Sequence, residues 1–153
     1  MDWLIALLTN PFLITSVSSW LVAQVIKMII SSIINKKFSL GWLFSDGGMP
    51  SGHSATVSSL AMFSLLSCGP SSFQFAVTMI LAIIVCHDAT GVRQEAGKHA
   101  VLLNEIMETL ELLKTKMDPY KKLKEYVGQT RVQVIAGITV GVVNALIMYF
   151  FVF

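Results

Sequence analysis

A turn that could hold an anion interrupts the apolar sequence at residues 47–54, where the chain reads GGMPSGHS. Pro50 suits the first turn of a helix, Ser51 or Ser54 could cap it, and the glycines let a ligand approach the backbone closely. Free N–H groups at such a helix start bind anions, and His53 stands where it could give a proton to a bound phosphate. The alternative is an ordinary capped loop with a surface histidine, and the local sequence favours neither.

A polar stripe lies within the first long apolar segment. Its members are three or four residues apart and therefore share one face of a helix: Ser16, Trp20, Gln24, Lys27, Ser31 and Asn35. Lys27 precedes Asn35 by eight residues, about 12 Å of helix. An ionisable side chain inside a membrane span marks a functional site by default. Snorkelling is the alternative, but Gln24 and Ser31 favour a polar pocket.

A third cluster of chemistry-bearing residues follows the apolar run at 73–85. Residues 87–99 read HDATGVRQEAGKH, with Asp88 at a helix end and Arg93 and Lys98 after a glycine turn. Arginine can bind two phosphate oxygens at once and lysine supplies a point charge, so the pair could clamp a phosphate. A solvated, salt-bridged interfacial loop is the alternative, but the clamp is favoured because Lys27 and the turn at 47–54 share its membrane side.

The elements that position these groups belong to an integral membrane protein. Of the 153 residues, 54% are hydrophobic and 13% charged, with a mean hydropathy of +0.70; soluble domains carry about 25% charged residues. The length indicates one membrane-embedded domain over 1–153. The net charge is only +2, and we expect no nucleic-acid partner. The spacing of Cys68 and Cys86 fits no metal or redox motif.

The hydrophobic runs predict an all-α polytopic bundle of about four transmembrane or re-entrant helices, plus one amphipathic interfacial helix. Two runs are long enough to span, and two shorter ones, each about 20 Å long, form a helical hairpin that tilts, extends into its polar flanks or re-enters. The amphipathic helix follows the hairpin, with apolar residues three and four apart. The predicted segments are 11–34, 54–67, 73–85, 93–116 and 132–153.

The basic residues predict which face of the membrane carries the site. Of the 11 Lys and Arg residues, only Lys27 lies within a predicted span, and none lies near the N-terminus, the Gly69 turn or the C-terminus. The positive-inside rule therefore places the polar face in the cytoplasm. The basic, aromatic strip at 120–124 suits anionic lipid headgroups or simply sets the topology.

The last span carries a stripe of small residues at Gly137, Gly141 and Ala145. Such stripes let helices approach closely in lipid. The stripe could join two copies in a homodimer or pack within one chain.

Three stretches together resemble one known family: GGMPSGHSA at 47–55, DATGVRQEAGKHAVLLNEI at 88–106 and VGQTRVQVIAGITVG at 127–141. The chain resembles the divergent branch of the type 2 phosphatidic acid phosphatase superfamily, which comprises acid phosphatase/vanadium-dependent haloperoxidase-related membrane proteins. The resemblance covers nearly the whole chain.

In the wider superfamily, a Lys-x6-Arg-Pro motif binds phosphate, and a Pro-Ser-Gly-His motif supplies backbone donors and an acid histidine. The second motif is intact at residues 50–53. The first keeps only Lys27, because Ile34 and Asn35 stand in place of Arg-Pro.

The third superfamily motif, Ser-Arg-x5-His-x3-Asp, supplies an arginine, a nucleophilic histidine and its orienting acid. Arg93 and His99 keep the spacing, but Val92 and Leu103 replace the serine and the acid. The branch usually has glutamine where His99 stands and histidine where Gln129 stands, so this chain exchanges the two. A phosphohistidine mechanism is therefore a hypothesis specific to this chain.

The resemblance implies a membrane enzyme that hydrolyses or transfers the phosphate or diphosphate of a lipid, with no metal or other cofactor. One histidine attacks, the other protonates the leaving oxygen, and an acid orients a histidine or holds the arginine. The catalytic set is His53, His99 and Asp88, and the substrate-binding set is Lys27, Ser51, Gly52, Arg93, Lys98, Gln24 and Asn104.

Two other functions compete with this one. The incomplete first and third motifs favour a non-catalytic lipid-phosphate-binding or membrane assembly protein that retains the fold. Haloperoxidase chemistry is a distant third, because a membrane-embedded site suits lipid headgroups better than soluble halide.

Overall fold

The computed structural model describes residues 2–36, 38, 41, 48–112, 123 and 128–153, without the side chains of 93 and 110–112. This part of the chain is helical and contains no strand, which confirms the all-α prediction. The basic strip at 120–124 lies largely outside the described residues. The helices are α1 (Asp2–Leu8), α2 (Pro11–Asn35), α3 (Gly52–Cys68), α4 (Phe73–Thr90), α5 (Val92–Leu112) and α6 (Arg131–Phe151).

Both hairpin helices extend beyond their apolar runs: α3 begins earlier, at Gly52, and α4 ends later, at Thr90. The hydroxyl oxygens of Ser51 and Ser72 accept backbone N–H groups in the first turns of α3 and α4. Three described stretches are long and apolar enough to cross a membrane: α2, α6 and the run from α4 into α5. With 17 residues, α3 rises about 25 Å, short of a 30 Å hydrocarbon core.

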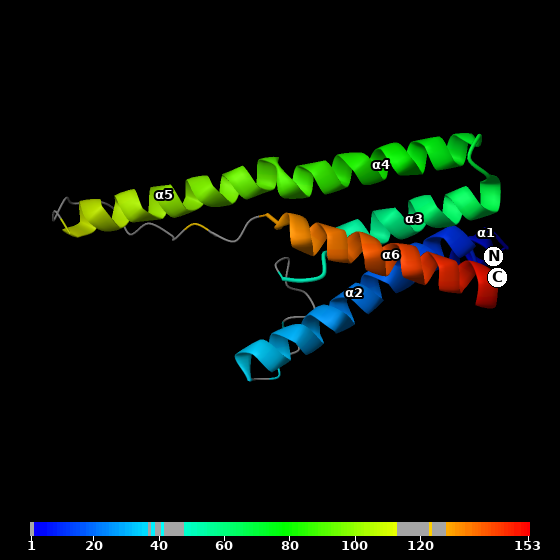
Figure 1. The fold of residues 1–153 in the computed structure, drawn as a ribbon, viewed down its shortest axis with the longest axis horizontal. Coiled ribbons are helices and arrows are strands. Elements are labelled where there is room, and N and C mark those ends of the chain that lie inside the picture. The colour runs from blue at the N-terminus through cyan, green and yellow to red at the C-terminus, as the bar shows by residue number, and fades with distance from the viewer. Residues whose placement is uncertain (1, 37, 39–40, 42–47, 113–122, 124–127) are drawn as a thin grey trace.

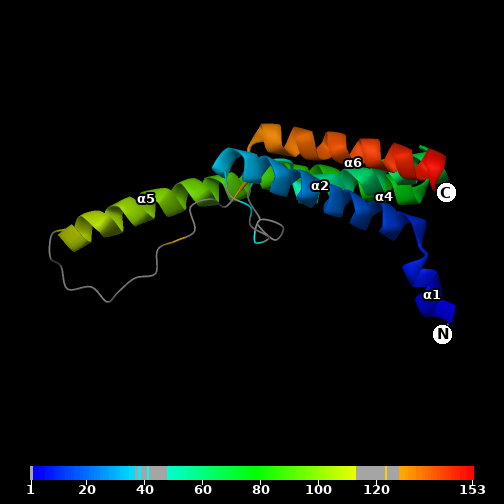
Figure 2. The same cartoon turned by 90° about the horizontal axis from the view of Figure 1, so that it is seen from below.

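Helix α3 lies at the centre of the bundle and packs against α2, α4 and α6, as Figure 1 shows. Both chain termini and the turn between α3 and α4 lie at one end. The start of α3 and the junction of α4 with α5 lie toward the other end, where α5 projects away (Figures 1 and 2). The polar segments identified in the sequence therefore share one end of the bundle.

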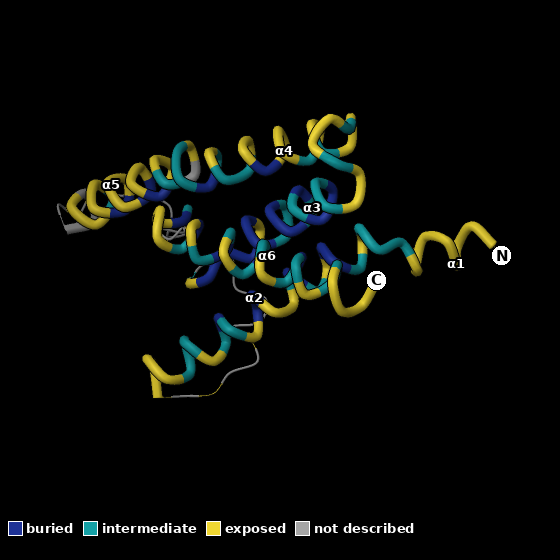
Figure 3. The backbone as a smooth tube through the Cα atoms, turned by 45° about the vertical axis from the view of Figure 1, so that its right-hand side comes forward, coloured by how far each residue is buried: buried dark blue, intermediate teal, exposed yellow. Residues whose placement is uncertain are grey.

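The outer surface of the bundle is apolar, as contact with lipid requires. On α4, only Ala82 and Ala89 are buried, and large side chains such as Ile80 and Ile84 face outward. Figure 3 shows how much of α4 is exposed. The interior instead holds small and polar side chains, including Ser54, which let the helices pack closely.

The small-residue stripe of α6 packs within the chain. Gly137, Gly141 and Ala145 are buried, and a Cβ added at Gly137 would lie 3.0 Å from the Cβ atoms of Ser51 and Ser54 on α3. The stripe therefore packs within one chain, which was the second of its two predicted roles. A homodimer remains a prediction, but these three residues are already buried within the chain.

A polar contact in the apolar bundle joins α6 to α2. The side-chain amide of Asn144 donates to the hydroxyl oxygens of Ser18 at 2.9 Å and Ser19 at 2.7 Å, and lies 3.3 Å from the carbonyl oxygen of Thr15. Such interhelical hydrogen bonds stabilise helix pairs in lipid.

Replacing Asn144 by leucine is expected to lower the free energy of unfolding by about 1–2 kcal/mol, because the serines of α2 lose the amide that donates hydrogen bonds to them. We expect a Tm about 2–8 °C lower when helix loss is followed by circular dichroism in detergent. The control is Thr139→Leu, an exposed position on α6 whose hydroxyl bonds only its own helix. Equal Tm changes in the two variants would show that the amide does not join the helices.

Helix α5 is the predicted amphipathic helix, with residues 113–116 of the predicted range outside the described residues. Gly91 alone separates it from α4, and its φ of −107° and ψ of −97° break the helix. Among the described helices, α5 contacts only α4. Residues on α5 are therefore held at a distance from α2 and α3.

Candidate functional site

The start of α3 is fixed by Ser51. Its hydroxyl accepts the N–H of Ser54 at 3.1 Å and donates to the Ser54 hydroxyl at 2.8 Å. Its own N–H donates to the carbonyl oxygen of Gln133 on α6 at 3.0 Å. The prediction that the backbone of Ser51 would bind substrate therefore needs correction, because α6 already uses that donor. Ser51 instead holds the turn in place.

The next two backbone N–H groups remain available. Those of Gly52 and His53 have no acceptor within the part of the chain that the structure describes. They point out of the N-terminal end of a 17-residue helix, where the peptide dipoles sum to a partial positive charge. This arrangement attracts an anion.

The polar stripe of α2 faces this turn. A Cβ added at Gly48 would lie 3.3 Å from Cγ of Lys27, and one added at Gly52 would lie 3.2 Å from Cδ1 of Trp20 and 3.7 Å from Oε1 of Gln24. Gly48 also has a φ of 102°, which side chains disfavour. Glycine is thus needed at both positions for the turn to lie against α2.

Two members of this stripe are buried polar groups. Lys27 is 2% exposed and Gln24 is 5% exposed. Because the stem of Lys27 packs on Gly48, its ammonium, two bonds beyond Cδ, lies close to the turn. Lys27 and Gln24 therefore lie buried where α2 faces the turn.

Gln24 also has an unsatisfied polar atom. Its Oε1 is buried and has no hydrogen-bond partner among the described residues. An unsatisfied buried polar group costs about 1–3 kcal/mol. Either end of the amide can point toward Gly52, because the positions of its O and N are assigned and not observed. A bound ligand or water at the turn would satisfy it.

His53 lies at the outer edge of the turn. It is the second residue of α3 and its side chain is exposed, in contrast to the buried Ser51 and Gly52 on either side of the helix start. An exposed imidazole there is accessible to a leaving group at the membrane surface.

The remaining predicted residues are on α4 and α5. Asp88 is half-buried in the last turn of α4, and Arg93 is in the first turn of α5, with its side chain outside the described set. The ammonium of Lys98 pairs with Glu95 at 2.7 Å on an exposed face, and His99 is exposed beside it. Since α5 contacts only α4 among the described helices, the structure does not bring Lys98 or His99 to the turn.

Asn104 has a structural contact in place of the predicted substrate contact. Its side-chain amide donates to the carbonyl oxygen of Leu123 and accepts the N–H of the same residue, both at 3.0 Å. Asn104 is 2% exposed. It therefore anchors the returning chain on α5.

Two residues near the turn were not predicted as site residues. Trp20 lies against Gly52, with its Nε1 3.4 Å from the added Cβ, and its spacing from Gln24 was the signal that could have identified it. Gln129 is buried at the junction of α4 and α6, where its N–H donates to the carbonyl oxygen of Ala89 and its Oε1 has no partner in the described chain. No spacing pattern in the sequence indicates the contact between Gln129 and Ala89.

Metal ligands were also sought. Within the described residues, no three His, Cys, Asp or Glu side chains lie close enough together to hold a metal ion.

The apolar exterior, the spanning helices and the polar turn define an integral membrane protein with a buried cationic and amide-lined site at one end of its bundle. The chain belongs to the divergent PAP2 family, whose pattern matches residues 8–144. The uncharacterized membrane protein YuiD of Bacillus subtilis (strain 168) is 38% identical over 154 residues, which cover 95% of this chain and 98% of the relative. No solved structure matches the chain.

Proposed function

We propose that the protein is a membrane phosphatase or phosphotransferase that acts on a lipid phosphate or diphosphate held at the start of α3. The observation that carries the proposal is that the N–H groups of Gly52 and His53, which have no acceptor among the described residues, lie beside the buried polar stripe of Lys27 and Gln24. Membership of the divergent PAP2 family supports a phosphatase-related function.

The turn supplies what a phosphate headgroup needs. The two backbone N–H groups and the ammonium of Lys27 offset its negative charge, and the amide of Gln24 hydrogen-bonds one oxygen. Groups fixed in advance around the phosphate also stabilise the charge that develops during transfer. His53, exposed at the edge, gives its proton to the lipid oxygen as the phosphorus–oxygen bond breaks.

The nucleophile comes from α5 in this proposal. A ring nitrogen of His99 attacks phosphorus, and water then releases phosphate from the phosphohistidine. This requires α5 to bend at Gly91 toward the turn, which would also bring Lys98. Asp88, in the last turn of α4 beside that glycine, would orient a histidine or hold Arg93.

The site faces the cytoplasm in the same proposal. The turn, the end of α2 and the start of α6 share one end of the bundle with α5 (Figure 1). Lys36 follows α2, Arg131 begins α6 and Lys98 is on α5, and the positive-inside rule assigns such basic ends to the cytoplasm.

A non-catalytic lipid-phosphate-binding protein is the second candidate. One observation favours it: His99 and Lys98 are on a helix that contacts only α4 among the described helices. The turn alone could then bind a headgroup without turnover.

Phosphate release from a panel of lipid phosphates and diphosphates tests the proposal. We expect release by the wild type, a rate lower by about 10²- to 10⁴-fold in His53→Ala, which loses its general acid, and no turnover in His99→Ala. His87→Ala is the matched control, since His87 is the third histidine and is exposed on α4.

The outcomes separate the candidates. Release that is unchanged in both variants would contradict the proposed site. Activity that survives in His99→Ala but not in His53→Ala would support an enzyme and show that His99 is not its nucleophile. Bound lipid phosphate with no release by the wild type would establish the second candidate.

A further inference from the structure

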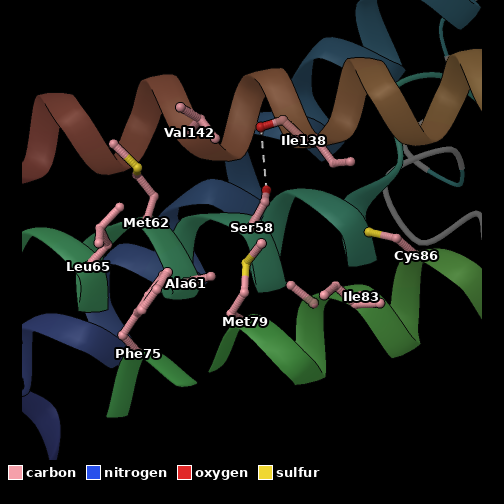
Figure 4. Close-up of a pocket in the computed structure, with 11 residues that line it drawn as sticks. Ser58, Ala61, Met62, Leu65, Phe75, Met79, Ile83, Cys86, Ile138 and Val142 are labelled. Atoms are coloured by element: carbon pink, nitrogen blue, oxygen red, sulfur yellow. Dashed lines mark hydrogen bonds between the residues drawn. The ribbon is translucent and has the colours of Figure 1, made fainter. Parts of the chain in front are cut away.

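A cavity of about 340 Å³ lies between α3, α4 and α6, beside the bundle interior. Figure 4 shows side chains from these three helices pointing into it. Its volume lies within the range of small-molecule sites, about 300–1,000 Å³. The larger side chains in its wall are apolar: Met62, Leu65, Phe75, Met79, Ile83 and Val142.

The cavity offers almost nothing to a polar ligand. Ser58 contributes the only hydroxyl in its wall, and that hydroxyl donates to the carbonyl oxygen of Ser54 at 2.6 Å, with the carbonyl of Ile138 3.4 Å away. A polar group placed there would lose its hydrogen bonds to water without replacement. The part of any ligand that enters must therefore be hydrocarbon.

The cavity is long enough to hold a hydrocarbon chain. Its lining extends along α4 from Phe75 to Cys86. These two residues are eleven positions apart, which is about 16 Å of helix and about half of a 30 Å hydrocarbon core. An acyl chain can therefore lie along the cavity.

One end of the cavity lies close to the candidate site. Ser58 is one helical turn beyond Ser54, which caps α3 with Ser51. Ile138 follows Gly137, the residue that packs on both of those serines. The cavity thus leads from the start of α3 toward the opposite end of the bundle.

We propose that this cavity binds one hydrocarbon chain of the lipid whose phosphate occupies the start of α3. The inference rests on the proposed function and adds to it the place where the hydrocarbon part of the lipid binds. The flexible thioethers of Met62 and Met79 suit chains that differ in shape.

Photo-cross-linking of the full chain in detergent tests this. The probe is phosphatidate with a diazirine in one acyl chain, and labelled residues are mapped by mass spectrometry. We expect label on the cavity wall, reduced about 10-fold by excess phosphatidate but not by phosphatidylcholine, as expected for a headgroup-specific difference of about 1.4 kcal/mol. Ala82→Phe, which fills the cavity, should lose the label, while Ala76→Phe on the exposed face of α4 should keep it.

The competition uses the wild type, so it holds even where a variant fails to fold. Equal displacement by phosphatidylcholine, or label confined to the outer surface, would overturn the inference. Phosphate release by a preparation that shows no cavity label would do the same and leave the proposed function standing. Competed label in a preparation that releases no phosphate would support the cavity and reject catalysis.

Discussion

Replacing Lys27 by methionine is expected to weaken the binding of a lipid phosphate by about 10- to 100-fold. A hydrogen bond to a charged group contributes about 1.5–3 kcal/mol, and each 1.4 kcal/mol is tenfold in affinity. Methionine keeps a stem of similar length against Gly48 and removes the buried charge. Isothermal titration of the detergent-solubilised protein with a lipid phosphate measures the effect.

Lys36→Met is the matched control for this prediction. Lys36 is exposed at the end of α2, away from the polar stripe that faces the turn. Its loss should leave the dissociation constant within about twofold of the wild-type value, because surface substitutions usually change free energies by no more than about 0.5 kcal/mol. Equal weakening in the two variants would show that Lys27 acts only through overall charge.

Replacing Gly141 by leucine is expected to prevent correct assembly of the bundle. A Cβ at this position would overlap the side chain of Ser58 and the carbonyl oxygen of Ala55 on α3. The carbonyl oxygen cannot yield without moving α3 away from α6, and overpacking of this kind costs about 1–3 kcal/mol or more. The better helix propensity of leucine returns only about 1 kcal/mol.

Size-exclusion chromatography in detergent, followed by thermal unfolding, measures this loss. We expect aggregation or a much lower Tm for Gly141→Leu and no change for Val143→Leu, an exposed position on the same helix. A Gly141→Leu protein that stays folded but changes from dimer to monomer would contradict the packing described within the chain. It would show instead that the stripe forms a dimer interface.

The bundle could largely be predicted from sequence, because apolar length and capping are local properties. Residues 54–67 and 73–85 became α3 and α4. Ser51 caps α3 ahead of its predicted start, and α4 continues past its apolar run to Thr90. The amphipathic pattern after Gly91 likewise predicted α5. The role of the small-residue stripe could not be decided, since close packing within a chain and between chains requires the same residues.

The candidate site was predictable only where it depends on helix periodicity. Spacings of three and four placed Gln24 and Lys27 on one face of α2, and the structure turns that face toward Gly52. The spacing of Arg93 and His99 gave no information about the direction of α5, which depends on the backbone angles at Gly91. Asn104 meets Leu123, a partner 19 residues along the chain that no periodic pattern indicates.

A competition between phosphatidate and diacylglycerol with identical chains tests the central claim most directly, because the two lipids differ only in the phosphate. Native mass spectrometry would report which lipid the protein retains. We predict that the wild type prefers phosphatidate by about 10-fold or more, and that the preference falls to near unity in Lys27→Met, which lacks the charge. A wild type with no preference, or the same preference in both proteins, would contradict a phosphate site at the start of α3.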